Sequence, residues 1–244
     1  MRFNVFTCVS LFAGMLSIQS LFGGELQVSA DFQVGLPQGE FKNQIDRGGI
    51  GVGFMGGYRF GGTPIMFGLD MGFMNFGKDE RVEPLSSTIP DLTVEVSNEY
   101  NLFHGDLLLR LISPDTDAAV RPYADGLVGF NYFYTETVLR ERGGIGSDDD
   151  VLRDTNFKDT SLRYGFGGGI QIRLFQATAD RDDDREKISI GTVSLNLMGR
   201  YIMGREAEYL REGSIHRENG EVFYDVSRSH TNMMYIKLGA VVTF

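Results

Sequence analysis

The sequence is poor in several residue types, and each shortage excludes a class of protein. Its 244 residues include one cysteine, Cys8, no tryptophan and three histidines. A framework of internal disulfides is therefore excluded. Basic residues number 23 against 33 acidic ones, which gives a formal net charge of −10. Because no basic stripe is available to neutralise phosphates, nucleic acid is excluded as a partner.

Long apolar runs are also scarce after the N-terminus. The longest uncharged run beyond residue 24 has 12 residues, Ile188 to Gly199. A membrane-spanning helix needs about 20 apolar residues, so a helical bundle in the membrane is excluded. A membrane β-barrel is not, because only every second residue of its strands faces lipid.

The first 24 residues differ from the rest of the chain. Arg2 is followed by 22 uncharged and mostly apolar residues, which end at Gly23 and Gly24 before the first acid, Glu25. This pattern is typical of a secretory signal peptide. We predict a signal peptide at 1–24 and a single cysteine-free domain at 25–244. A retained anchor helix is the alternative.

The body of the chain alternates apolar and small or polar residues with a period of two. In 65–75 the odd positions are Ile65, Phe67, Leu69, Met71 and Phe73, opposed by Gly68, Asp70 and Gly72. This alternation, bounded by Gly, Pro and Asp, indicates strands with one apolar face. Eight such segments occur: 26–36, 50–60, 65–75, 100–112, 120–134, 162–174, 188–203 and 234–244.

The expected connections alternate in length. Segments 37–48, 77–98, 140–159 and 204–230 are long, whereas 61–64 and 113–119 are short and 175–187 is intermediate. In an up-and-down outer-membrane barrel, short turns lie on the periplasmic side and long loops outside. We therefore predict an all-β fold, an eight-stranded antiparallel up-and-down transmembrane β-barrel. A soluble lipocalin-like barrel, with its bulky face around a ligand cavity, is the structural alternative.

The C-terminus carries the most specific motif. The chain ends with polar Lys237, then Gly239, apolar Val242 and terminal aromatic Phe244 at fixed spacing. This resembles the β-signal of bacterial outer-membrane barrels, and the whole chain resembles small OmpA/OmpX-like barrels. The resemblance implies a place in the bacterial outer membrane among lipids and lipopolysaccharide. It also implies that the barrel-assembly machinery reads Gly239, Val242 and Phe244 during insertion. We further expect a monomer.

Charged residues on the small face predict a network inside the barrel. An eight-stranded barrel has an interior just wide enough for side chains. Crowded carboxylates disfavour one another's ionised form unless basic groups intervene. We expect Asp31–Lys237, across the closure of the first and last strands, as the leading pair. The predicted network comprises Asp31, Asp70, Asp106, Arg110, Asp125, Arg163, Arg200 and Lys237.

Other polar groups offer little chemistry. No histidine pair has metal-ligand spacing, and His104 has no evident second ligand. The acid runs 148–150 and 182–184 lack the spacing of a calcium loop. We expect both runs to be solvated charge. For 148–150 the alternative is that it binds divalent ions that bridge lipopolysaccharide. Ser229-His230 near Glu221 and Asp225 leaves a rim lipid hydrolase as an alternative, although no specific motif of such enzymes is present. We expect no catalytic, metal or cofactor site.

The functional hypothesis follows from these expectations. The chain would be a non-enzymatic outer-membrane barrel with a structural or surface-interaction role, meeting an unknown extracellular partner through four long loops. A narrow channel or small-molecule transporter is the first alternative. A rim lipid hydrolase is the second alternative, and a soluble ligand-binding barrel is the third.

Overall fold

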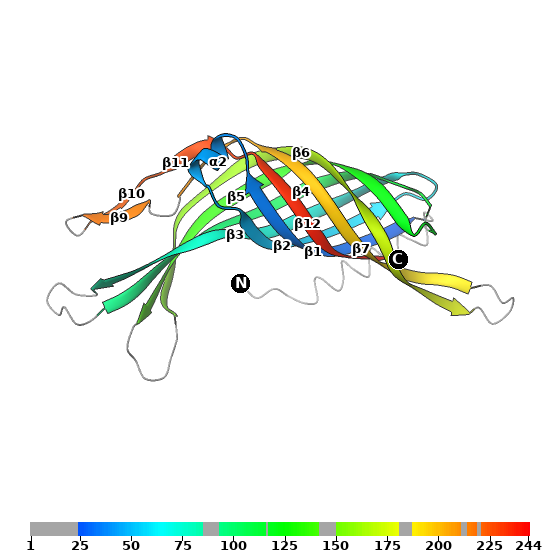
Figure 1. Cartoon of the computed structure of the whole chain (residues 1–244), viewed down its shortest axis with the longest axis horizontal. Coiled ribbons are helices and arrows are strands. Elements are labelled where there is room, and N and C mark those ends of the chain that lie inside the picture. Colours follow the sequence, from blue (N-terminus) through cyan, green and yellow to red (C-terminus); the bar gives the residue numbers. More distant parts are fainter. Residues whose placement is uncertain are drawn as a thin grey trace.

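The chain folds into a closed antiparallel β-barrel (Figure 1). The computed structural model describes residues 24–84, 93–115, 117–141, 150–180, 187–210, 214–218 and 221–244. The barrel order is β1-β12-β7-β6-β5-β4-β3-β2. Its strands are β1 (Glu25–Pro37), β2 (Gly49–Arg59), β3 (Ile65–Pro84), β4 (Thr93–Ile112), β5 (Val120–Glu141), β6 (Asp150–Asp180), β7 (Lys187–Gly204) and β12 (Met233–Thr243). The predicted eight-stranded up-and-down barrel is confirmed.

The first and last strands close the ring. Asp31 of β1 lies opposite Gly239 of β12, and the backbones of Leu26 and Phe244 exchange two hydrogen bonds of 3.1 and 2.9 Å. A Cβ at Gly239 would come within 2.2 Å of the Ala30 carbonyl oxygen and 2.5 Å of the Asp31 carboxylate. Glycine at this position of the C-terminal motif therefore permits the close approach of the two closing strands.

We call the end of the barrel that holds Glu25 and Phe244 the terminal end and the opposite end the far end. The terminal end carries the turn at 61–64, the connection 113–119 and the β6–β7 hairpin. In the first turn Gly62 adopts φ 70°, and the Phe60 carbonyl accepts a hydrogen bond from the Thr63 amide at 3.1 Å. Left-handed backbone of this kind favours glycine, as expected for a tight turn.

Several predicted loops are largely strand. β3 and β4 remain paired as far as Pro84 and Thr93, and β5 and β6 as far as Arg140 and Asp150. The predicted loops 77–98 and 140–159 are thus mostly continuations of barrel strands, and so is much of 175–187. The prediction relied on an apolar face long enough to cross a membrane. Strand extensions that project into water need no such face.

The far end is covered by small elements. Helix α2 (Glu40–Gln44) lies in the β1–β2 connection, and β8 (Glu206–Tyr209) pairs with β11 (Ser227–His230) in the β7–β12 connection. A second hairpin is formed by β9 (Ile215–Glu218) and β10 (Glu221–Tyr224). In the described part of the chain, no helix is long and apolar enough to span a membrane.

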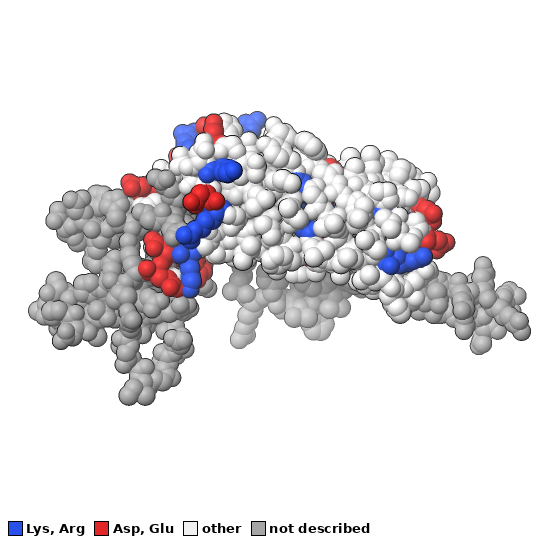
Figure 2. All heavy atoms as spheres, in the orientation of Figure 1, with Lys and Arg blue, Asp and Glu red and all other residues white. Residues whose placement is uncertain are grey.

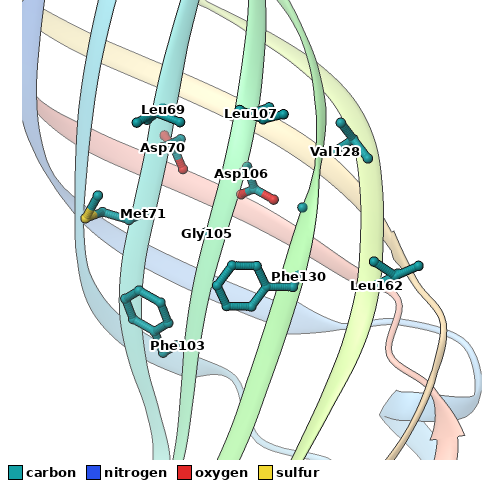
Figure 3. A pocket seen from close by; sticks show the side chains of 11 residues that line it. Leu69, Asp70, Met71, Phe103, Gly105, Asp106, Leu107, Val128, Phe130 and Leu162 are labelled. Atoms are coloured by element: carbon teal, nitrogen blue, oxygen red, sulfur yellow. The ribbon is translucent and has the colours of Figure 1, made fainter.

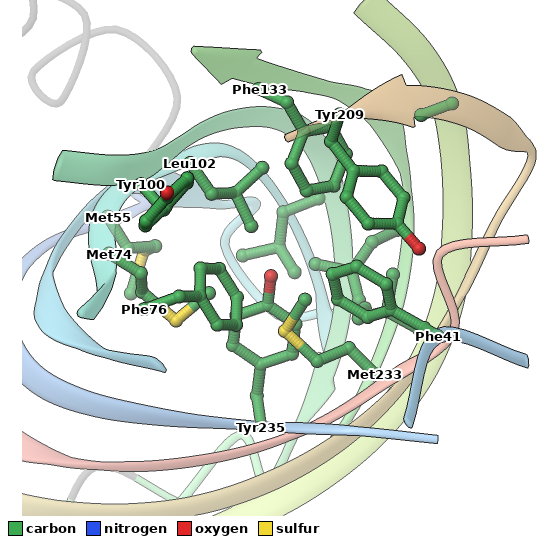
Figure 4. Close-up of a cluster of buried hydrophobic side chains, with 14 of the residues drawn as sticks. Phe41, Met55, Met74, Phe76, Tyr100, Leu102, Phe133, Tyr209, Met233 and Tyr235 are labelled. Carbon is green, nitrogen blue, oxygen red and sulfur yellow. The ribbon is translucent and has the colours of Figure 1, made fainter. Parts of the chain in front are cut away.

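The main apolar core lies inside the barrel, and its far-end portion is an aromatic cap (Figure 4). We call Phe41, Phe76, Phe133 and Tyr209 the aromatic cap. The Phe41 ring of α2 meets the other three edge-on, with centroid distances of 5.2 to 5.9 Å. Such edge-to-face contacts stabilise aromatic clusters beyond simple burial. One residue of α2 therefore anchors the β1–β2 connection to the barrel interior.

Candidate functional site

The outer wall of the barrel is apolar. Large side chains that alternate along the strands project outward and are solvent-exposed, including Phe54 (55%), Phe166 (61%) and Leu107 (63%). The middle of the surface is largely uncharged, and charged residues gather toward the two ends (Figure 2). Aromatic contacts occur on the wall on either side of this middle zone, as between Tyr58 and Phe60 and between Tyr132 and Tyr134. Soluble monomeric proteins do not expose an apolar surface of this extent to water.

The interior is polar and charged, beginning at the terminal end. Glu25 accepts hydrogen bonds from Arg59 at 2.7 Å and from Arg121 at 2.7 and 3.1 Å. Arg121 also donates to the Ser113 carbonyl at 3.0 Å. All three charged side chains are buried. This cluster joins β1, β2 and β5 across the lumen and fills the terminal end.

The middle of the lumen holds the largest charge cluster. Asp125 accepts a bidentate pair from Arg110 at 2.7 and 3.0 Å and a further bond from Arg200 at 2.8 Å. Arg200 also contacts Asp70 at 3.0 Å, and Lys237 donates to Asp70 at 2.8 and 3.1 Å. Bidentate arginine–carboxylate pairs are the strongest of the hydrogen-bonded ion pairs. The two carboxylates are therefore each held by two cations.

A third layer lies toward the far end. Arg163 forms a bidentate pair with Asp106, both bonds 2.9 Å long, and donates to Asn131 and the Tyr235 hydroxyl at 2.9 Å. His104 Nδ1 lies 3.3 Å from Asp106. The Tyr235 ring packs against both the Arg163 guanidinium and the His104 ring. Tyr235 belongs to the apolar core as well, so this layer joins the charges to the core below the aromatic cap.

The exterior and interior together decide the environment of the molecule. A closed barrel satisfies its backbone hydrogen bonds between strands, and the apolar face of this one points outward while its charges point inward. The chain is an outer-membrane β-barrel. The soluble alternative required the reverse arrangement, with apolar side chains inward around a ligand cavity, and it is wrong.

No family model matches the barrel's sequence, and no curated protein sequence matches it. Among solved structures, Neisserial surface protein A aligns with a TM-score of 0.36 and 14% identity over 91% of this chain and 96% of that one. The Ail protein of Yersinia pestis, solved with the heparin analogue sucrose octasulfate, aligns with a TM-score of 0.32 and 14% identity over 91% and 97%. A major outer membrane protein of Thermus thermophilus gives 0.31 and 11% over 89% and 99%. The fold assignment rests on strand pairing rather than on these likenesses.

All eight members of the predicted charge network are buried in the barrel. The structure brings seven of them into direct ion pairs, and the exception is Asp31. Asp31 accepts hydrogen bonds from Ser29 at 3.0 Å and Asn196 at 3.1 Å. The predicted Asp31–Lys237 pair does not form between these two described residues. The closing register places Gly239 opposite Asp31, and Lys237 reaches Asp70 across the lumen instead.

Several lumenal groups lie outside the predicted network. They include Glu25, the first acid after the predicted leader, and its partners Arg59 and Arg121. Both arginines lie on the inward face of alternating segments, so the period-two pattern was the available signal. Tyr235 alternates with the exposed Met234 and Ile236 and is a further lumenal residue outside the predicted network.

His104 has the ligand neighbours that the sequence did not suggest. Asp70, His104 and Asp106 can each direct one ligand atom toward a common point, with these atoms within 4.8 Å of one another. A cation at that point would compete with Lys237 and Arg200 for Asp70 and with Arg163 for Asp106. Asp70 and Asp106 are already compensated by these three basic side chains, so internal ion pairing accounts for the cluster.

Among the rim residues whose side chains the structure describes, Ser229 and His230 do not form the pair that a hydrolase triad needs. Ser229 Oγ lies 2.7 Å from the Tyr209 hydroxyl, whereas His230 points to the other face of β11 and contacts Glu40 at 3.0 Å. Consecutive residues of a strand face opposite ways, so the two side chains cannot act together. The side chains of His216, Glu221 and Asp150 lie outside the described residues, as do 148–149, 182–184 and residues 1–23 of the predicted leader.

Proposed function

We propose that this barrel is a non-enzymatic surface protein whose role is carried by strands that project beyond the far end. This proposal assigns the far end to the cell exterior, in accord with the predicted orientation. The observation that carries it is that four neighbouring strands continue past the barrel rim as one sheet. Outer-membrane lipids, lipopolysaccharide and the assembly machinery are the remaining proposed partners, with a monomer as the proposed state.

The projecting sheet is defined by the strand registers. β2 pairs with β3 only as far as Ile50–Asn75, whereas β3 stays paired with β4 to Pro84–Thr93. We call residues 78–84, 93–99, 136–141 and 150–155 the projecting sheet (Figure 1). Where β3 leaves the barrel, Gly77 adopts φ 125° within a register shift between Asn75 and Lys78. This bulge turns the strand away from β2.

The outer edge of the projecting sheet is suited to contact. In the registers of the described strands, β3 has a partner on one side only beyond Asn75. A strand edge presents unpaired N–H and C=O groups, which extended segments of other proteins can pair with. The lumen, by contrast, is filled by ion pairs and the aromatic cap. A role at the surface therefore fits the structure better than transport.

Shortening the projecting sheet tests the proposal. An Asn-Gly turn would replace 80–97 between Asp79 and Asn98, and another would replace 138–153 between Thr137 and Asp154, which are facing pairs in the register. The matched control replaces 179–188 at the terminal end, between Thr178 and Ser189. Heat-modifiable migration on SDS gels would verify that each barrel is folded.

Cells that express each variant would be compared for retention on a serum-coated surface and for cell–cell sedimentation. We expect the wild type and the terminal-end control to increase surface retention, cell–cell sedimentation or both, relative to cells without the protein. The variant with the shortened projecting sheet should lose the increase. Equal retention and sedimentation for both shortened variants and the wild type, or no effect of the wild type, would count against a surface-interaction role.

A further inference from the structure

A hollow interrupts the lipid-facing wall across β3, β4, β5 and β6, and the proposed surface role does not use it (Figure 3). Its volume is about 510 Å³. We call it the Gly105 hollow. It is lined by Leu69, Asp70, Met71, Phe103, Gly105, Asp106, Leu107, Val128, Gly129, Phe130 and Leu162.

The hollow arises because one outward position lacks a side chain. Across the sheet, Met71 lies opposite Gly105, Gly105 opposite Phe130, and Phe130 opposite Leu162. These residues form one outward row, in which Gly105 is the gap. The rows on either side carry large apolar residues, such as Leu107 and Phe103 on β4 itself. The backbone of β4 therefore forms the floor of the hollow, and bulky side chains form its margins.

The hollow presents no polar side chain to a ligand. Asp70 and Asp106 contribute to its lining, but their carboxylates are bonded inside the lumen by Lys237 and Arg163. The backbone of the floor is paired on both sides within the barrel. A molecule in the hollow would gain apolar burial and dispersion contacts only. The backbone of the site is also preformed, because every lining residue lies on a paired strand.

We infer that the Gly105 hollow is a binding site for one acyl chain of a membrane lipid. The hollow is continuous with the apolar wall that contacts the bilayer, where acyl chains are the surrounding medium. Its volume lies within the range of about 300–1,000 Å³ found for small-molecule sites. Apolar lining without a hydrogen-bonding group fits a hydrocarbon chain and selects against a headgroup. The inference rests on the membrane location and is independent of the role of the projecting sheet.

Filling the hollow from within the chain gives a direct test. A Cβ at Gly105 would lie 3.1 Å from the edge of the Phe130 ring, a side-chain tip that can turn aside, so Gly105→Leu is compatible with the strand. Gly199 is the matched control, because it is exposed on β7 and a Cβ there meets nothing within 4 Å. The proteins would be reconstituted in vesicles of phosphatidylcholine with brominated acyl chains, extracted into detergent and washed. Bromine per folded barrel would then be measured by mass spectrometry.

We expect the wild type and Gly199→Leu to retain brominated lipid, and Gly105→Leu to retain about tenfold less, a change equivalent to about 1.4 kcal/mol. Equal retention by all three proteins would overturn the inference. So would a wild-type dimer that Gly105→Leu dissociates, because the occupant would then be a second copy.

A second measurement does not depend on Gly105→Leu folding. Since the chain has no tryptophan, single reporters can be placed by Leu162→Trp at the hollow and by Leu238→Trp on exposed wall of β12. In detergent, brominated phosphatidylcholine added at a stoichiometric amount should quench the reporter at 162 more strongly than the one at 238. Equal quenching would overturn the inference.

Discussion

At the scale of single residues, the lumen is stabilised because each central carboxylate is paired with two basic side chains. Asp70 and Asp125 are completely enclosed, yet each contacts two basic side chains and Arg200 bridges them. Enclosing a charge is costly unless partners and hydrogen bonds compensate it. Removing one partner leaves the other charge uncompensated, so the network tolerates single losses poorly.

Lys237→Met tests this at one position. Asp70 would keep Arg200 but lose Lys237, and we expect the free energy of unfolding in detergent to fall by about 3 kcal/mol. The measurement is urea unfolding followed by the heat-modifiable gel shift. Lys78→Met is the control, since Lys78 pairs with Glu80 at an exposed position and should cost less than about 1 kcal/mol. Equal losses in the two variants would contradict a structural role for the lumenal pair.

At the scale of elements, helix α2 is attached by two unlike contacts. Phe41 enters the aromatic cap, and the Glu40 carboxylate accepts hydrogen bonds from the His230 amide at 3.1 Å and from the His230 ring at 3.0 Å. The backbone N–H of His230, followed by its side chain, lowers the pKa of Glu40 below its usual value. The carboxylate contact is exposed to water, so the solution pH acts on it directly.

The pH dependence of α2 follows from this shift. A carboxyl whose pKa is lowered by folding stabilises the attached state above its unfolded pKa. That stabilisation is lost as the pH falls through the lowered value. A spin label at Lys42→Cys, in a Cys8→Ser background, should therefore become more mobile as the pH falls below about 4.5, the ordinary pKa of a glutamate. Glu40→Gln should abolish the transition in the electron paramagnetic resonance spectrum, and an identical transition in that variant would rule out Glu40 as its source.

At the scale of the whole molecule, the barrel is a filled cylinder between two aqueous ends. Three layers of ion pairs lead from Glu25 to Tyr235, and the aromatic cap lies at the far end. Eight strands enclose a lumen that side chains can occupy completely. The strands that form this wall also supply the projecting sheet, so one continuous sheet joins the membrane part to the proposed contact surface.

A filled lumen predicts a closed barrel in electrical recordings. In planar lipid bilayers we expect no stepwise conductance from the wild type. Phe41→Ala removes the central ring of the aromatic cap but leaves the ion pairs in place, so it should stay closed too. Steady conductance steps in the wild type would favour the channel alternative, and steps in Phe41→Ala alone would show that the cap is the barrier.

The architecture and the faces of the strands follow from the sequence pattern alone. Period-two alternation depends on strand geometry alone, so the eight strands and the inward positions of residues such as Asp70 and Lys237 could be read directly. The short connections 61–64 and 113–119 also indicated that one end of the barrel, the terminal end, carries the short turns. The C-terminal motif marked the strand that closes the ring, where Gly239 meets β1.

Which inward charges meet depends on the three-dimensional arrangement of the strands. Strand tilt and the closing register set Lys237 against Asp70 rather than Asp31, and partners from opposite walls have no relation in sequence spacing. The extent of the projecting sheet was equally hidden, because strands in water need no apolar face. The Gly105 hollow is defined only when four strands are in register, because a gap in a wall depends on the neighbours that surround it.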